Sequence, residues 1–210
     1  MPTPSLDELV NRVRGLLADR PRIVIGIAGA PGSGKSSLAR KLTRRLQDAG
    51  VPAAQVPMDG FHLADVTLDA LGLRTRKGAV ETFDAHGYVA LLRRLHDVPE
   101  HAVHAPGFER RLEQPIAAAV TVPATTRVVV TEGNYLLDAD DPWPEARTLM
   151  AEVWFVELDE NRRRSRLVER HVASGKDRTA AQAWVDDVDE PNAQRVRDRR
   201  GEADLVVATE

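Results

Sequence analysis

The most constraining feature of this chain is the segment Gly29–Ser36, which reads GAPGSGKS. It matches the pattern G-x-x-x-x-G-K-[ST] in full. An apolar run, 23–28, precedes it, and a helical pattern with Leu38, Leu42 and Leu46 on one stripe follows it. Glycines let the backbone N–H groups of such a loop turn inward, and the helix N-terminus adds partial positive charge. The segment therefore predicts a site for the phosphates of a nucleotide.

Two side chains of this segment predict the chemistry of the site. Lys35 would bring a full positive charge to the phosphates, and the hydroxyl of Ser36 is placed to coordinate Mg²⁺. An acidic residue at the end of a neighbouring strand can hold the same ion directly or through water. Glu132, after the valine-rich run 127–131, is the candidate, although an acid there could equally cap a helix or begin a turn. The predicted nucleotide contacts in the loop are Gly29, Ala30, Pro31, Gly32, Ser33, Gly34, Lys35, Ser36 and Ser37.

The overall composition restricts the class of protein. A length of 210 residues suits one domain, 1–210, with a substantial core. The net charge of −3 argues against a protein that coats nucleic acid, because such proteins carry a strong basic excess. The sequence contains no cysteine, and no run approaches the roughly 20 apolar residues that cross a bilayer. We therefore expect a cytoplasmic protein without a nucleic-acid or membrane partner.

Alternating strand and helix patterns predict a three-layer α/β fold. Near-continuous apolar runs indicate strands buried on both faces, which is typical of a parallel sheet. The predicted strands are 23–28, 53–58, 127–131, 152–158 and 203–208. Because Pro57 cannot donate to a ladder, the second strand is expected at the sheet edge.

Helical periodicity accounts for much of the remaining chain. The first helix should begin with Ser5 as its N-cap in a capping box with Glu8, and the phosphate-loop helix should end before Gly50. Besides that one, the predicted helices are 5–19, 88–97, 160–174, 179–188 and 191–200. Residues 63–87 are expected to be irregular, and 98–124 to be loop-like with short strands.

Asp59 follows the second predicted strand, where open parallel sheets bind their ligands. Transfer of a phosphoryl group to a hydroxyl benefits from a carboxylate that orients the hydroxyl and accepts its proton. The neighbouring Gly60 would let a substrate approach closely. Asp-Gly is also a strong turn signal, so a simple turn is the alternative interpretation. With the phosphate loop upstream, we interpret Asp59 as the catalytic base.

Three arginines, Arg163, Arg166 and Arg170, share one face of the helix predicted at 160–174, because they are three and four residues apart. Like charges this close repel one another unless an anion comes near. Guanidinium groups pair phosphate oxygens bidentately. We therefore expect a helical lid over 160–178, with Arg163 as a nucleotide contact and Arg166 and Arg170 as catalytic groups. The alternative is a solvated helix balanced by Asp159, Glu160 and Glu169.

Candidate contacts to a phosphate acceptor are aromatic or polar residues of the remaining segments, and each is a weak signal by itself. They are Phe61, His62, Arg76, Lys77, Phe108, Arg110, Tyr135 and Asn192. His101 and His104 lie in a loop without paired carboxylates, so we interpret them as surface residues rather than metal ligands.

Five segments, in order along nearly the whole chain, resemble the uridine kinase, pantothenate kinase and phosphoribulokinase group of P-loop kinases. They are GIAGAPGSGKSSLA, MDGFH, RKGAVETFD, VVVTEGNYLL and RRRSRLVERHVASGK. The first is shared by many nucleotide-binding proteins, whereas the ordered set is much more specific. The resemblance implies a P-loop NTPase fold whose five-stranded parallel sheet has the order 2-3-1-4-5, with the phosphate-loop strand at its centre. It also implies Asp59 as the catalytic base, Glu132 near the metal and the arginine helix as the lid.

Within this group the chain resembles the branch described as nucleoside/nucleotide kinase-like. RKGAVETFD is similar to a segment of bacterial pantothenate kinases, yet the chain lacks their Tyr-Ser-His motif. Uridine kinases carry Phe-Asp-His-Pro where this chain has Glu81–Asp84. The resemblance implies a kinase that uses ATP and Mg²⁺ on a hydroxyl of a small metabolite, with a nucleoside as the first acceptor class and a sugar or pantothenate as the alternative. It also allows a homodimer.

A nucleotide-responsive regulatory protein that hydrolyses ATP slowly is the alternative outside the kinases. The acid at position 59 and the arginine cluster favour phosphoryl transfer over sensing. No Asn-Lys-x-Asp motif for guanine occurs in the sequence, which disfavours a GTPase switch.

Overall fold

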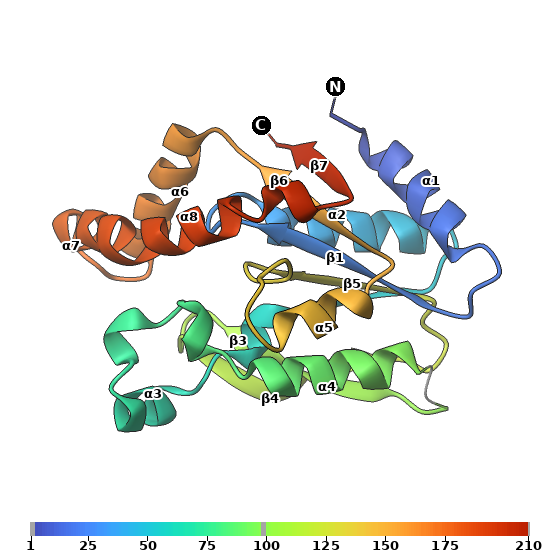
Figure 1. The fold of residues 1–210 in the computed structure, drawn as a ribbon, viewed down its shortest axis with the longest axis horizontal. Coiled ribbons are helices and arrows are strands. Elements are labelled where there is room, and N and C mark those ends of the chain that lie inside the picture. Colours follow the sequence, from blue (N-terminus) through green and yellow to red (C-terminus); the bar gives the residue numbers. More distant parts are fainter. Residues whose placement is uncertain (1–2, 98–99, 210) are drawn as a thin grey trace.

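A parallel sheet lies at the centre of the fold (Figure 1). The structure is a computed structural model that describes residues 3–97 and 100–209, so the first two residues of the stretch predicted at 98–124 lie outside it. Across the described residues, this sheet has five strands in the order β2-β5-β1-β6-β7, and every neighbouring pair is parallel. The strands are β1 (Ile23–Gly29), β2 (Ala53–Pro57), β5 (Val128–Gly133), β6 (Glu152–Glu157) and β7 (Leu205–Ala208). The predicted order is confirmed, since a hairpin outside this sheet takes the numbers β3 and β4.

Helices cover both faces of the sheet, as the predicted three-layer fold requires (Figure 1). Successive residues of a strand point to opposite faces. The isoleucines of β1 pack on one side with α1 (Leu6–Leu17) and α2 (Lys35–Asp48). The residues between them face α4 (Ala85–His96) and α5 (Trp143–Thr148) on the other side. In the described part of the chain no helix has the length and apolarity needed to cross a membrane.

The termini of the first two helices follow the predicted signals. The hydroxyl of Ser5 accepts from the N–H of Glu8 at 3.3 Å, and the Glu8 carboxylate accepts from the Ser5 N–H at 2.7 Å. The capping box is therefore confirmed, although α1 ends two residues earlier than expected. Gly50 follows α2 with a φ of +77°, the left-handed conformation that glycine adopts without strain. Pro57 ends β2, which is an edge strand as predicted.

Two segments contain more regular structure than the sequence suggested. Residues 63–87 include α3 (Asp65–Leu71) and two short turns, η2 (Arg74–Arg76) and η3 (Val80–Thr82). Within 98–124 lies an antiparallel hairpin of β3 (Val103–Glu109) and β4 (Gln114–Val122). Short strands were expected here, but their length and their pairing into a hairpin were not, because alanine, glycine and proline dilute the apolar alternation that marks a strand.

The helices after β6 differ from the prediction in their continuity. They are α6 (Glu160–Ala173), α7 (Arg178–Trp184) and α8 (Glu190–Arg197), with a π-helical turn η4 (Val185–Asp189) between the last two. The helices expected at 179–188 and 191–200 are thus one unbroken helical stretch. Pro191 lies in the first turn of α8, where the missing N–H of proline is tolerated. The wider π turn joins the two helices, so the proline does not end the stretch.

A buried arginine joins β1 to the segment that precedes β5. The guanidinium of Arg22 donates to four carbonyl oxygens, at 2.8 Å to Thr126, 3.0 Å to Leu95, 2.9 Å to Ala124 and 3.4 Å to Pro123. Burial lowers the pKa of Arg22. Because the contacts reach the end of α4 and the turn after β4, this one side chain stabilises the junction of three segments.

We predict that Arg22→Met destabilises the fold by about 2–4 kcal/mol, since buried carbonyl oxygens would lose their donors. Urea denaturation followed by circular dichroism measures the change. Arg127→Met is the matched control, because Arg127 donates to the exposed carbonyls of Arg20 and Pro21 and should cost less than about 1 kcal/mol. Equal stability of the two variants would contradict the assigned role of Arg22.

Candidate active site

A cavity of about 490 Å³ lies beside the phosphate loop, at the carboxyl ends of the central strands. Such an edge is where open parallel sheets bind ligands. The cavity brings together most of the residues that the sequence singled out. Those that line it are Pro31, Gly32, Gly34, Lys35, Ser36, Ser37, Asp59, His62, Lys77, Phe108, Arg110, Arg166, Arg170 and Asn192.

The phosphate loop has the backbone geometry that its glycines predict. Gly32 and Gly34 have φ values of +81° and +96°, which other residues rarely adopt. Gly34 is the N-cap of α2, so the first N–H groups of that helix face the loop. Lys35 follows as a buried residue, and burial lowers its pKa, while the charges of Glu132 and Asp59 oppose that shift. A buried ammonium at a helix N-terminus is well placed to meet phosphate oxygens.

Ser36 and Glu132 meet at the same place. The Ser36 hydroxyl donates to Glu132 Oε2 at 3.0 Å, and Glu132 is 3% exposed. Burial, with the neighbouring charge of Asp59, raises the pKa of Glu132 to about 7. The oxygen donors of these two residues fit Mg²⁺, which binds few protein ligands and keeps phosphates and waters as the others. No cluster of three or more His, Cys, Asp or Glu residues that could hold a metal occurs in residues 3–97 and 100–209.

Asp59 lies in the short turn η1 (Met58–Phe61) that follows β2. Arg110, in the turn between β3 and β4, places its guanidinium 3.4 Å from Asp59 Oδ2. The neighbouring glycine has a different role from the one expected, because a Cβ at Gly60 would lie 2.3 Å from the carbonyl oxygen of Pro106. Gly60 therefore permits close packing of the hairpin rather than close approach of a substrate.

The imidazole of His62 has a defined orientation. Its Nδ1 lies 2.8 Å from the carbonyl oxygen of Asp59, and a carbonyl only accepts, so Nδ1 carries the hydrogen. The ring packs between Phe83, at 4.1 Å between centroids, and Phe108, at 4.8 Å. Burial lowers the pKa of His62, which keeps the ring neutral and leaves Nε2 as an acceptor.

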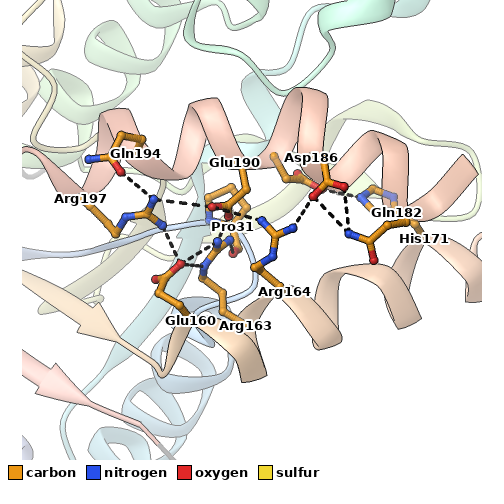
Figure 2. A network of polar contacts seen from close by, with 11 residues as sticks. Pro31, Glu160, Arg163, Arg164, His171, Gln182, Asp186, Glu190, Gln194 and Arg197 are labelled. Carbon is orange, nitrogen blue, oxygen red and sulfur yellow. Dashed lines mark hydrogen bonds and ion pairs between the residues drawn. The ribbon is translucent and has the colours of Figure 1, made fainter. Parts of the chain in front are cut away.

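The arginine helix α6 divides into two groups of side chains. Arg166 and Arg170 line the cavity, and desolvation by surrounding protein lowers the pKa of Arg170 although its side chain keeps solvent contact. Arg163 is 1% exposed and lies against the phosphate loop, donating to the Pro31 carbonyl at 3.0 Å (Figure 2). This placement corrects the expectation that Arg163 contacts the nucleotide. The spacing of the arginines could not show that Glu160 and Glu190 would pair with Arg163.

Several other predicted residues lie outside the large cavity. Phe61 is buried in the core with its ring 5.3 Å from that of Tyr88, and the buried Tyr135 donates its hydroxyl to the Gly78 carbonyl at 2.7 Å. Arg76 pairs with Glu81 at 2.7 Å on the surface. These positions correct the expectation of substrate contacts at Phe61, Tyr135 and Arg76. Of the loop residues, Gly29 ends β1, and Ala30 and Ser33 line a second cavity of about 380 Å³ instead.

Sequence reasoning missed residues that reach the cavity from segments around the phosphate loop and the C-terminal helices. They are Asp65, Arg74, Gly78, Glu113, Asn134, His171, Ser174, Lys176, Trp184 and Asp189. Lys77 Nζ binds Asp65 Oδ1 at 2.6 Å, and His171 Nε2 lies 2.7 Å from Asp189 Oδ2. Asn134 could have been found, because it follows Glu132 at the same strand end. Asp189 could not, because it belongs to the π turn.

Comparison with known proteins identifies the family to which the chain belongs. Residues 24–207 match the sequence profile of the phosphoribulokinase/uridine kinase family. A Schizosaccharomyces pombe protein provisionally named a uridine kinase, C227.14, is 34% identical over 81% of this chain and 75% of its own length. The Escherichia coli protein YggC, whose name ascribes no activity, is 36% identical over 89% of this chain and 77% of its own.

A solved structure extends the likeness to the whole fold. It comes from Silicibacter sp. TM1040 and is provisionally described as a fructose transport system kinase. It superposes with a TM-score of 0.87 at 36% identity, covering 97% of this chain and 98% of that one. The family match includes the phosphate loop, Asp59, Glu132 and the arginine helix. The chain therefore belongs to the phosphoribulokinase/uridine kinase family of P-loop kinases.

Proposed function

We propose that this protein transfers the γ-phosphoryl group of Mg-ATP to a hydroxyl of a small metabolite. The observation that carries the proposal is the presence of Asp59 in the same cavity as Lys35 and Ser36. A protein that only sensed a nucleotide would need the phosphate loop, but it would not need a carboxylate facing that loop. Membership of a kinase family also supports phosphoryl transfer.

Each residue has a role in the proposed reaction that follows from its chemistry. Asp59 orients the acceptor hydroxyl and takes its proton as the oxygen attacks the γ-phosphorus and the bond to ADP breaks. Lys35, Arg166 and Arg170 offset the charge on the transferring group. Mg²⁺, held through Ser36 and Glu132, would supply further positive charge to the phosphate oxygens. Arg110 holds the Asp59 carboxylate through its 3.4 Å contact.

A nucleoside is the acceptor class that we favour. The rings of His62 and Phe108 line the cavity 4.8 Å apart and offer a surface on which a flat base can pack. His62 Nε2 can accept a hydrogen bond from an N–H or O–H group, and Lys77, which lies 5.8 Å from the Phe108 ring centroid, can donate one. These groups lie in the same cavity as Asp59.

A sugar or pantothenate is the alternative acceptor. Many of the side chains that line the cavity are charged or polar, and such groups form hydrogen bonds with hydroxyl-rich ligands. The relatives include one provisionally named for uridine and one provisionally described for fructose, which supports testing both classes.

An acceptor screen tests the proposal directly. ADP release is measured with Mg-ATP alone and with nucleosides, sugars, sugar alcohols or pantothenate added. Stimulation by one acceptor, with the phosphorylated product found by mass spectrometry, is the expected result. Slow release that no acceptor stimulates would support the regulatory alternative instead.

We predict that Asp59→Asn lowers kcat by about 100- to 10,000-fold, because the amide cannot accept the proton. The affinity for Mg-ATP, measured by calorimetry, should stay within about threefold, since Asp59 faces the acceptor. Asp48→Asn on the exposed end of α2 is the matched control and should behave as wild type. Turnover within threefold of wild type in Asp59→Asn would remove the residue from its assigned role.

We predict that Lys35→Met weakens Mg-ATP binding by about 10- to 100-fold, because a charged donor to the phosphates is lost. The variant should remain folded, since methionine removes a buried charge that is costly to desolvate. Calorimetric titration measures the affinity, and thermal unfolding checks the fold. Lys41→Met, exposed on the same helix, is the control and should bind normally. Equal affinities of Lys35→Met and Lys41→Met for Mg-ATP would contradict the assigned role of Lys35.

A further inference from the structure

The helix α6 presents two different faces to the site. Arg166 and Arg170, four residues apart, line the cavity beside the phosphate loop. Arg163 and Leu167, also four residues apart, are buried on a neighbouring face. Because the four side chains belong to one helix, the position of the buried pair determines the position of the cavity pair.

The buried face packs directly on the phosphate loop. A Cβ at Gly32 would lie 2.8 Å from Leu167 Cγ and 3.1 Å from the Arg163 carbonyl oxygen. Even a methyl group at this loop position would therefore push α6 away. The first two turns of the expected lid thus form a fixed wall of the loop in this structure, and the glycine is needed for that approach as well as for its φ of +81°.

Ion pairs of the buried Arg163 add to the packing. The Arg163 guanidinium donates to the Pro31 carbonyl at 3.0 Å and to Glu160 Oε2 at 2.9 and 3.1 Å, and it pairs with Glu190. The Arg163 side chain is almost fully removed from solvent, whereas the side chains of Glu160 and Glu190 keep 48% and 22% of their exposure. Removing one partner would leave a buried charge or an unpaired carbonyl.

The same network joins α6 to the neighbouring helix α8 (Figure 2). Glu190 is the first residue of α8, and Asn192, two residues later, lines the cavity. Arg164 lies 3.4 Å from Glu190 as well, and Arg197 binds Glu160 at 2.8 Å. Acidic residues of α6 and α8 are therefore shared between arginines of both helices, and the cluster holds the helices together on the loop.

We propose that Arg163 and Glu190 are a positioning pair that fixes α6 and α8 against Pro31 and thereby sets Arg166 and Arg170 over the phosphates. The kinetic consequence rests on the proposed function. Arg163 touches no reacting atom in this scheme and acts only through the loop and the helix. A shift of about 1 Å in catalytic groups can lower the rate about 100-fold, so a pair that holds Arg166 and Arg170 in place affects catalysis.

The test compares Arg163→Met, Arg163→Lys and Glu190→Gln with Arg162→Met, an exposed neighbour on the same helix that serves as the control. Steady-state kinetics should show kcat falling about 10- to 100-fold in Arg163→Met with a smaller change in KM for ATP. Lysine keeps the charge but not the fork of donors, so Arg163→Lys should lie between Arg163→Met and wild type. The double variant Arg163→Met/Glu190→Gln should be no slower than Arg163→Met alone, because the two residues act as one unit.

A second measurement needs no catalytic activity. Hydrogen exchange of the amides in 29–36 and 160–173, in nucleotide-free protein, should be at least about tenfold faster in Arg163→Met than in wild type or Arg162→Met. If Arg163→Met does not fold, Glu190→Gln and Arg163→Lys carry the same comparison.

Unchanged exchange in these segments, or a kcat within twofold of wild type in folded Arg163→Met, would overturn the proposal. Acceleration spread evenly over the whole sheet would also overturn it, because a merely structural residue would produce that pattern. If wild-type protein transferred no phosphoryl group, the proposed function would fail. Hydrogen exchange would still decide whether Arg163 and Glu190 hold α6 against the phosphate loop.

Discussion

The parallel register of three central strands is the constraint on which the site depends. Ile27 of β1 and Pro57 of β2 both pair with Glu132 of β5, so the three strands end within two residues of the same level. The phosphate loop, Asp59 and Glu132 therefore emerge side by side, although they lie far apart in the sequence. A shift of one residue would turn every side chain of a strand to the other face, and burial on both faces prevents it.

The site concentrates buried charge that a merely stable protein would avoid. Lys35, Glu132 and Arg163 are each buried, and desolvation moves the pKa of Lys35 downward and that of Glu132 upward, so both ionised forms are disfavoured. Arg163 is held by ion pairs with Glu160 and Glu190, whereas Lys35 lines the cavity and Glu132 lies beside it in contact with Ser36, where a nucleotide and its metal would offset the cost. The contrast separates a structural charge from charges that await a ligand.

The arginine helix combines support and recognition in a few turns. Its buried face packs against Gly32 and Pro31, and its other face lines the cavity. The π turn before α8 belongs to the same arrangement, because it carries Asp189 into the cavity and directs Glu190 toward Arg163. π turns are uncommon and occur often at functional sites, which agrees with this placement.

The sequence by itself determined the phosphate loop, the five parallel strands, the first helix with its cap, and the candidates Asp59 and Glu132, because each rests on local pattern or strand-end position. The order of the strands was implied only by the family resemblance. Tertiary structure decided which arginines face the cavity, since Arg163, Arg166 and Arg170 are equivalent by spacing alone. It also removed Phe61, Tyr135 and Arg76 from the cavity and added Asp65 and Asp189. Those outcomes depend on how helices and a hairpin pack around the sheet, and periodicity along one element carries no information about the element that will lie against it.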